Sequence, residues 1–175
     1  MTVIHCTRKL AQKLSGVSAA PIAEASALGS WHANLVRFDR RQCVFFCHDA
    51  TRYCLFLAGL RAPQFADLGR WHRELFFASL AMEGVSDQVI ARAGITIGPA
   101  RFDSKTDRSV LGSMRVAQWD LEAFVLREDH VMDVDPLLAA RRLNERPAMA
   151  NGKLLWPARA MREMLVRLDL ESTKM

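Results

Sequence analysis

The sequence predicts an α+β fold in which a small, mostly antiparallel sheet, made of an N-terminal strand and a three-strand meander, is covered by helices. Three observations support this. Short segments rich in β-formers crowd the first third of the chain, helical periodicity begins near Pro63, and no repeat, low-complexity tract or linker interrupts the sequence. With 175 residues, the chain is long enough for one domain spanning 1–175 with a substantial core. The helices are expected to cover one face of the sheet.

Four short segments are predicted as strands. TVIHC at 2–6 is rich in β-formers, and HANLVRF, QCVFFCH and TRYCLFL follow one another after a loop at 16–29. Polar breaks at 39–41 and 48–50 separate the last three segments. Because such short breaks suit hairpin turns, these segments form an antiparallel meander.

The remaining segments carry helix signals. Thr7 can cap a helix at 7–14, and Ser86 and Asp135 precede two more apolar periodic stretches. A helix at 63–84 ends at Gly84, and residues 95–102 read as extended, broken at Gly98 and Pro99. The other helices are expected at 86–94, 109–129 with Asp107 or Ser109 as its cap, 136–145, and after Pro157.

Three of the four cysteines lie between 43 and 54, close to His48. Side chains alternate along a strand, so Cys43 and Cys47 share a face about 13 Å apart, too far for one zinc ion. Cys54 is expected opposite Cys47, but a metal would need further ligands such as His48 or His5. We therefore expect buried free thiols that pack as small hydrophobes.

Composition limits the classes of function. The net charge is +5, weighted to the first half of the chain, which favours a nucleic-acid partner, although no basic run exceeds two residues. No apolar run is long enough to span a membrane, and the N-terminus lacks the pattern of a signal peptide, so a cytoplasmic protein is expected. The motifs that mark nucleotide cofactors, serine hydrolases, zinc proteases and kinases are absent, and no cofactor is predicted.

The most suggestive polar segment is DSKTDRS at 103–109. Lys105, Thr106, Arg108 and Ser109 gather just before a predicted helix, whose N-terminus favours anions. With the arginines around the hairpin they would form one basic patch that binds a phosphate or nucleic acid. Those arginines are Arg37, Arg40, Arg41 and Arg52, of which Arg40 and Arg41 are the predicted contacts. The alternative is a capped helix beside a solvated basic loop.

A second polar cluster surrounds His130. It contains Glu128, Asp129, Asp133 and Asp135, and clustered carboxylates can hold Mg²⁺ or Mn²⁺. Acidic residues also favour the start of the next helix, so a solvated turn is expected here and no metal site is predicted.

Four stretches carry a family resemblance: IHCTRKLAQKL, WHANLVRFDRRQCVFF with the T-R-Y that follows, DRSVLGSM, and LNERPAM. Together they resemble a family of small, uncharacterised bacterial proteins that carry a domain of unknown function. The resemblance implies kinship across nearly the whole chain and a cytoplasmic bacterial setting near mobile elements. It transfers no catalytic residue.

Two kinds of function remain open. The first is a non-catalytic module that binds nucleic acid or another protein, in a mobile-element, toxin–antitoxin or phage-defence setting. The second is an enzyme for a phosphorylated or nucleotide substrate, with residues 103–109 holding the phosphate and His32, His48 or His72 carrying a proton. Apolar residues near the C-terminus are expected either to dock onto the sheet or to form a dimer contact: Trp156, Met149, Met161 and Met164.

Overall fold

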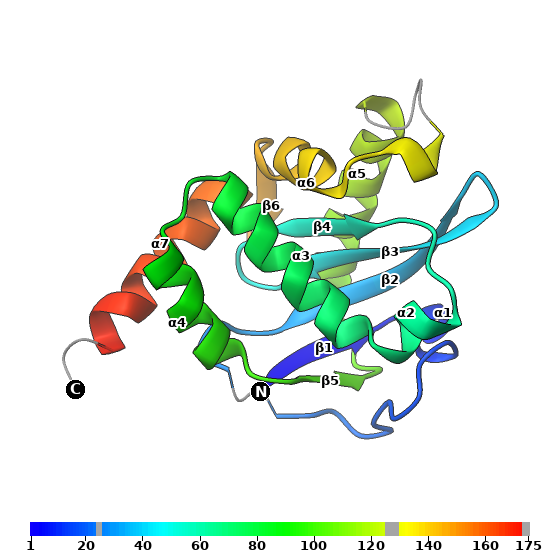
Figure 1. Ribbon diagram of the computed structural model, residues 1–175, viewed down its shortest axis with the longest axis horizontal. Coiled ribbons are helices and arrows are strands. Elements are labelled where there is room, and N and C mark those ends of the chain that lie inside the picture. The colour runs from blue at the N-terminus through cyan, green and yellow to red at the C-terminus, as the bar shows by residue number, and fades with distance from the viewer. Residues whose placement is uncertain (24–25, 125–129, 173–175) are drawn as a thin grey trace.

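The elements follow one another as strands first and then mainly helices (Figure 1). The computed structural model describes residues 1–23, 26–124 and 130–172. The strands are β1 (Thr2–Cys6), β2 (Trp31–Phe38), β3 (Arg41–His48), β4 (Cys54–Leu57), β5 (Ala100–Asp103), β6 (Ala148–Ala150) and β7 (Lys153–Leu155). The helices are α1 (Arg8–Ala11), α2 (Ala62–Ala66), α3 (Leu68–Met82), α4 (Asp87–Ile97), α5 (Arg108–Phe124), the 3₁₀ turn η1 (Val131–Asp133), α6 (Pro136–Asn144) and α7 (Pro157–Ser172).

The main sheet has the strand order β4-β3-β2-β1-β5. The predicted meander is confirmed, since β2, β3 and β4 pair antiparallel. The prediction of a mostly antiparallel sheet is wrong, because β1 pairs parallel with both β2 and β5. The chain passes from β1 to β2 through α1 and a loop, and from β4 to β5 through α2, α3 and α4. Each such crossover returns the chain to the end of the sheet where the earlier strand began. Strand propensity does not show whether two neighbouring strands run parallel or antiparallel.

Helices pack on both faces of the sheet, which corrects the expectation that they cover one (Figure 1). One buried cluster joins Trp31 and Phe46 to α3, α4 and α7. The other joins Phe45 and Phe56 to α5 and α6. Every residue of Cys43–His48 is buried, as expected of a central strand covered on both sides.

Several helix boundaries follow the predicted caps. The side chains of Ser86 and Asp135 each accept a backbone N–H of the helix that follows. The helix predicted at 63–84 is instead two helices, because the backbone of Asp67 leaves the helical region between α2 and α3. The predicted extended segment at 95–102 is also shorter, since α4 continues to Ile97 and β5 begins at Ala100.

The C-terminal region docks onto its own domain. Met161 is fully buried and Met164 packs against the core, whereas Trp156 and Met149 are about half exposed. The β6–β7 hairpin was not expected, although its turn is Asn151-Gly152 with positive φ at both residues, a common signal for a tight hairpin. Within the described ranges, no helix has both the length and the apolar character needed to cross a bilayer.

Replacing each of two helical glycines by alanine should change the stability of the protein in opposite directions. A Cβ at Gly112 in α5 would meet no atom within 4 Å, so Gly112→Ala should stabilise the protein by about 0.5–1 kcal/mol, the helix propensity difference. A Cβ at Gly69 in α3 would lie 2.7 Å from the Cβ of Ala100, so Gly69→Ala should destabilise it. Urea unfolding measures both variants. A less stable Gly112→Ala protein would contradict the packing described for α5.

Candidate functional site

One row of side chains crosses the main sheet on the face that α5 covers. The strand register places Asp103 beside His5, His5 beside His32, His32 beside Cys47 and Cys47 beside Cys54. We call Asp103, His5 and His32 the polar row. Cys47 and Cys54 continue it into the apolar cluster under α5. Along this one line across the strands, the side chains therefore change from charged and polar to apolar.

A buried carboxylate fixes the orientation of His5. Asp103 is fully buried, and its Oδ1 lies 2.6 Å from Nδ1 of His5. The carboxylate also accepts the backbone N–H groups of Ile22 and Lys105. Burial raises the pKa of Asp103, but the hydrogen bonds from His5 and Ile22 outweigh it, so the pKa lies below its ordinary value. The carboxylate therefore stays charged and holds the proton of His5 on Nδ1.

The other ring nitrogen of His5 is available. Within the described residues, the side-chain hydrogen bond of His5 is made through Nδ1, and the side chain keeps 7% of its surface exposed. An imidazole with a carboxylate on Nδ1 and a free Nε2 can accept a proton or a hydrogen bond at Nε2.

His32 has both ring nitrogens occupied. Its Nδ1 lies 2.6 Å from Asp49, and its Nε2 accepts the backbone N–H of Asp107 at 2.8 Å. Because Nε2 accepts, the ring proton is on Nδ1. The ring centroids of His5 and His32 are 5.0 Å apart. His32 therefore connects the segment after β5 to the turn after β3. It has a structural role and no nitrogen left to bind a ligand.

The start of α5 already holds an anion. The Asp107 carboxylate accepts the N–H groups of Ser109 and Val110, and these hydrogen bonds lower its pKa. The predicted cap is confirmed at Asp107. The first-turn donors are thus satisfied by the protein itself.

Arg52 is buried rather than part of an exposed basic patch. Only 3% of it is exposed, and its backbone has φ of 57°, a strained value for a non-glycine residue. Its guanidinium donates to the hydroxyls of Ser109 and Ser113 and to the carbonyls of Asp49 and Met149. It therefore joins α5, the β3–β4 turn and β6.

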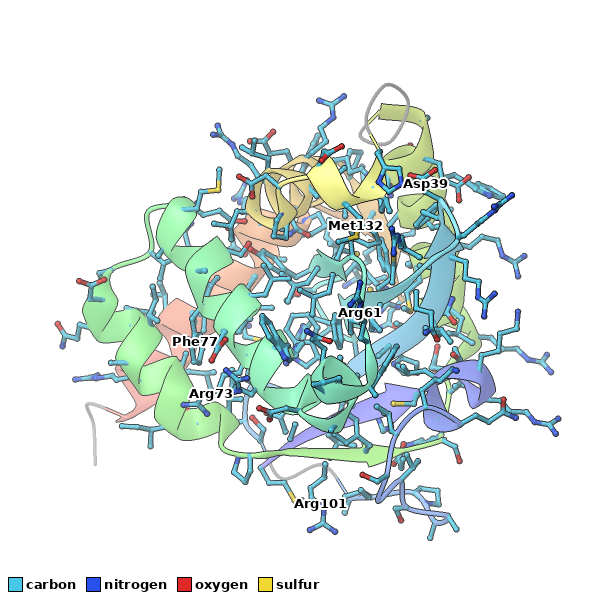
Figure 2. The ribbon with its side chains drawn as sticks, turned by 45° about the vertical axis from the view of Figure 1, so that its right-hand side comes forward. Asp39, Arg61, Arg73, Phe77, Arg101 and Met132 are labelled. Atoms are coloured by element: carbon cyan, nitrogen blue, oxygen red, sulfur yellow. The ribbon has the colours of Figure 1, made fainter. Side chains whose placement is uncertain are left out.

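The structure separates the residues predicted to bind an anion. Lys105 and Thr106 are exposed just before α5, and Arg108 and Ser109 form its first turn. Arg40 and Arg41 lie at the β2–β3 turn, about 20 Å along β2 from His32. Asp39 in this turn accepts the N–H of Val131 in η1, and Figure 2 shows Asp39 far from Arg101 on β5. One patch does not join the two groups.

A groove that the sequence did not indicate lies beside the polar row. It has a volume of about 590 Å³ and we call it the basic groove. It is lined by Thr7, Arg8, Lys9, Asn34, Leu35, Val36, Arg37 and Gln118. Thr7 donates to Asn34 at 2.8 Å. These two follow His5 and His32 by two residues, so they stand on the same face of the sheet, one step along from the polar row.

The other histidines named as proton carriers lie on the opposite sheet face. His48 and His72 are buried there around Trp31, and burial lowers their pKa values to about 4 and about 3. His48 bonds to Leu28 O and Thr51. Neither ring reaches the basic groove.

The acidic cluster has structural contacts where it is described. Asp135 caps α6 and His130 accepts the N–H of Met132, while Glu128 and Asp129 lie outside the described residues. In the parts of the chain that the structure covers, no three His, Cys, Asp or Glu side chains are grouped to hold a metal.

The four cysteines are free and buried, as predicted. Burial raises the pKa of Cys6 to about 12, and a hydrogen bond with Cys54 raises the pKa of Cys47. Thiolate is the reactive form, so native protein should not react with a chromogenic disulfide reagent until it is denatured. Rapid reaction of one thiol in the native state would contradict this packing.

Comparison with known proteins gives a family and no function. Residues 3–160 match the family described as a domain of unknown function, DUF6933. No match was found among curated proteins or among solved structures. The match covers both edges of the sheet, the polar row and the basic groove, and the chain belongs to the DUF6933 family.

Proposed function

We propose that this protein binds a phosphate-bearing ligand, a nucleotide or a nucleic-acid strand, in the basic groove. The observation that carries the proposal is the charge of the groove. Arg8, Lys9 and Arg37 line it, and no carboxylate is among its lining residues. Clustered cations attract phosphate and raise its association rate.

The size and position of the groove support the same ligand class. Its volume of about 590 Å³ falls within the usual range of small-molecule sites. It opens where β1 ends, and ligands of sheets with parallel strands often bind beyond the carboxyl ends of those strands. Thr7, Asn34 and Gln118 add neutral hydrogen-bonding groups that can fix the orientation of a base or sugar.

Lys105 adds charge to the same edge. It follows β5, which ends beside β1, and no ion pair engages it within the described residues. Arg40 and Arg41 are exposed at the β2–β3 turn, apart from Lys105. Only a strand of several nucleotides would reach both Lys105 and these arginines.

Fluorescence anisotropy tests the proposal with labelled ATP and with labelled single-stranded and duplex oligonucleotides at low salt. We expect saturable binding of at least one probe, weakened by salt. Removing a lysine or arginine that contacts phosphate should reduce the slope of log affinity against log salt by about one. Lys9→Ala and Arg37→Ala should each show this loss.

Arg167→Ala on α7 is the matched control. It removes the same charge from an exposed position on a helix at the other side of the fold and should leave affinity unchanged (Figure 1). If no probe binds at low salt, or if Arg167→Ala weakens binding as much as Arg37→Ala, the groove does not bind phosphate.

A second candidate function is an enzyme acting on a phosphate of the same ligand. The observation that favours it is the pair of Asp103 and His5, which bond through Nδ1 of His5 and leave Nε2 for a ligand. In hydrolysis, His5 would take a proton from water as the water oxygen bonds to phosphorus. The bond from phosphorus to the leaving oxygen breaks, and that oxygen takes a proton from solvent.

His5→Gln separates the two candidates. It keeps a side chain that can bond to Asp103 but cannot act as a base near neutral pH. Under the enzyme candidate, incubation with nucleoside triphosphates or oligonucleotides yields product, and His5→Gln loses turnover while keeping ligand affinity. If the wild-type protein binds its ligand and yields no product, it is a binding module.

We further propose that the protein works in the bacterial cytoplasm, in a mobile-element, toxin–antitoxin or phage-defence setting. Four free thiols suit a reducing compartment. A growth assay of cells expressing the chain, with and without its neighbouring genes, tests the setting. Unchanged growth, with and without phage, would count against it.

A further inference from the structure

A second pocket lies between the first turns of α5 and the β6–β7 hairpin. It has a volume of about 360 Å³ and we call it the apolar pocket. It is lined by Arg108, Ser109, Gly112, Ser113, Val116, Arg146, Pro147, Ala148, Met149 and Leu154. It shares no lining residue with the basic groove, so its occupant is independent of the proposed phosphate ligand.

The walls of this pocket are mainly hydrocarbon and open to solvent. Val116, Met149 and Leu154 are exposed by 49%, 52% and 65%, high values for such side chains. Gly112 leaves space between them, because a Cβ there would meet no atom within 4 Å. Exposed apolar side chains gathered around a hollow are typical of a ligand site.

Three arginines surround the apolar walls of the pocket: Arg52, Arg108 and Arg146. Buried Arg52 donates to Ser109, Ser113 and the carbonyl of Met149, all of which line the pocket. Among the described residues no carboxylate pairs with Arg52 or with exposed Arg108, whereas Arg146 pairs with Asp120. A buried cation normally has a counter-ion, and the Asp107 carboxylate at the start of α5 interacts electrostatically with Arg52 without pairing with it directly. The pocket lies on the far side of the two serine hydroxyls.

We propose that the apolar pocket binds a small molecule with an apolar body and a single carboxylate. The apolar body packs against Gly112, Val116 and Leu154. The carboxylate accepts from Arg108 and from the hydroxyl of Ser109, and the charge of Arg52 favours it through that hydroxyl. The pairing of a hydrocarbon wall with the charge of Arg108 and Arg52 selects an apolar acid over a neutral molecule or a small inorganic anion.

Isothermal titration calorimetry with octanoate, 1-octanol and acetate tests this assignment on the full chain. Octanoate should bind, and 1-octanol should bind at least about tenfold more weakly, because it cannot form charge-assisted hydrogen bonds. Acetate, which lacks the apolar body, should show no heat of binding. Equal affinity for octanoate and 1-octanol would overturn the role of the arginines, and failure of octanoate to bind would overturn the site.

Variants test whether octanoate binds in this pocket. Gly112→Leu should abolish octanoate binding by filling the space, and the circular dichroism spectrum of the variant shows whether it is folded. Arg108→Gln should weaken octanoate about tenfold and leave 1-octanol unchanged. Arg115→Gln is the matched control, an exposed arginine of α5 that does not line the pocket, and should match wild type. Full octanoate affinity in a folded Gly112→Leu protein would contradict the proposal.

Discussion

The free energy of unfolding should fall steeply as the pH drops from 6.5 to 4, because two histidines are buried in their neutral form. Burial lowers the pKa of His48 to about 4 and that of His72 to about 3. In the unfolded chain both take up a proton below about pH 6.5. The unfolded state then binds more protons than the folded state, so stability decreases as the pH decreases.

The expected loss of stability is large enough to measure easily. Each histidine contributes a slope of about 1.4 kcal/mol per pH unit once the pH is well below 6.5, or about 3 kcal/mol over the range to pH 4. Glu83, whose pKa is raised by burial, has the opposite sign and offsets part of the loss. Two histidines together would remove up to about 6 kcal/mol, a large part of the 5–15 kcal/mol that stabilises a typical domain, so the urea midpoint should fall strongly between pH 6.5 and 4. Urea titrations at several pH values measure this change.

His72→Phe isolates one of the two contributions. The ring of His72 packs edge-on against Trp31 at 4.5 Å, and its Nε2 is buried without a partner. Phenylalanine keeps the ring and should about halve the slope between pH 6.5 and 4. A wild-type free energy that is flat over this range would show that the two histidines are not held neutral. The lowered pKa values of Asp103 and Asp107 add further loss only below about pH 3.8.

Replacing Arg52 by leucine should lower the free energy of unfolding by about 3 kcal/mol or more. Hydrogen bonds to a charged group contribute about 1.5–3 kcal/mol each, and this guanidinium serves two serine hydroxyls and two carbonyls. Its left-handed backbone costs energy that these bonds offset. Leucine would remove all four of these hydrogen bonds, and among the described residues only the Met149 carbonyl would keep another donor, the Ser113 hydroxyl.

Arg52→Lys provides the graded comparison. An ammonium group can serve some of these acceptors but lacks the planar fork, so we expect an intermediate loss in the same urea experiment. Leucine and wild type of equal stability would mean that the contacts of Arg52 do not stabilise the joint between α5 and β6.

Much of the architecture could be predicted from local signals. Polar breaks at 39–41 and 48–50 fixed the meander, and Ser86, Asp107 and Asp135 marked helix starts. These features depend on neighbours in sequence. The parallel pairing of β1 with β5 does not, since β5 follows β1 only after four helices and three strands.

The candidate site was less predictable for the same reason. His5 and Asp103 are separated by 98 positions, and only the fold brings them to 2.6 Å. Arg52 reads as one more surface arginine, yet it is buried by elements from three parts of the chain. The basic groove combines the start of α1 with β2, which no local pattern links. By contrast, the Asn151-Gly152 turn was a readable signal for the missed hairpin.

A two-dimensional NMR titration tests the basic groove most directly. Isotope-labelled protein is titrated with ATP and with a short single-stranded oligonucleotide at low salt. Phosphate binding in the groove predicts saturable shifts of the backbone amides of Thr7, Lys9, Asn34 and Arg37, with little change along α7. Saturable shifts that spare these residues and gather elsewhere, or no shifts with either probe, would contradict it.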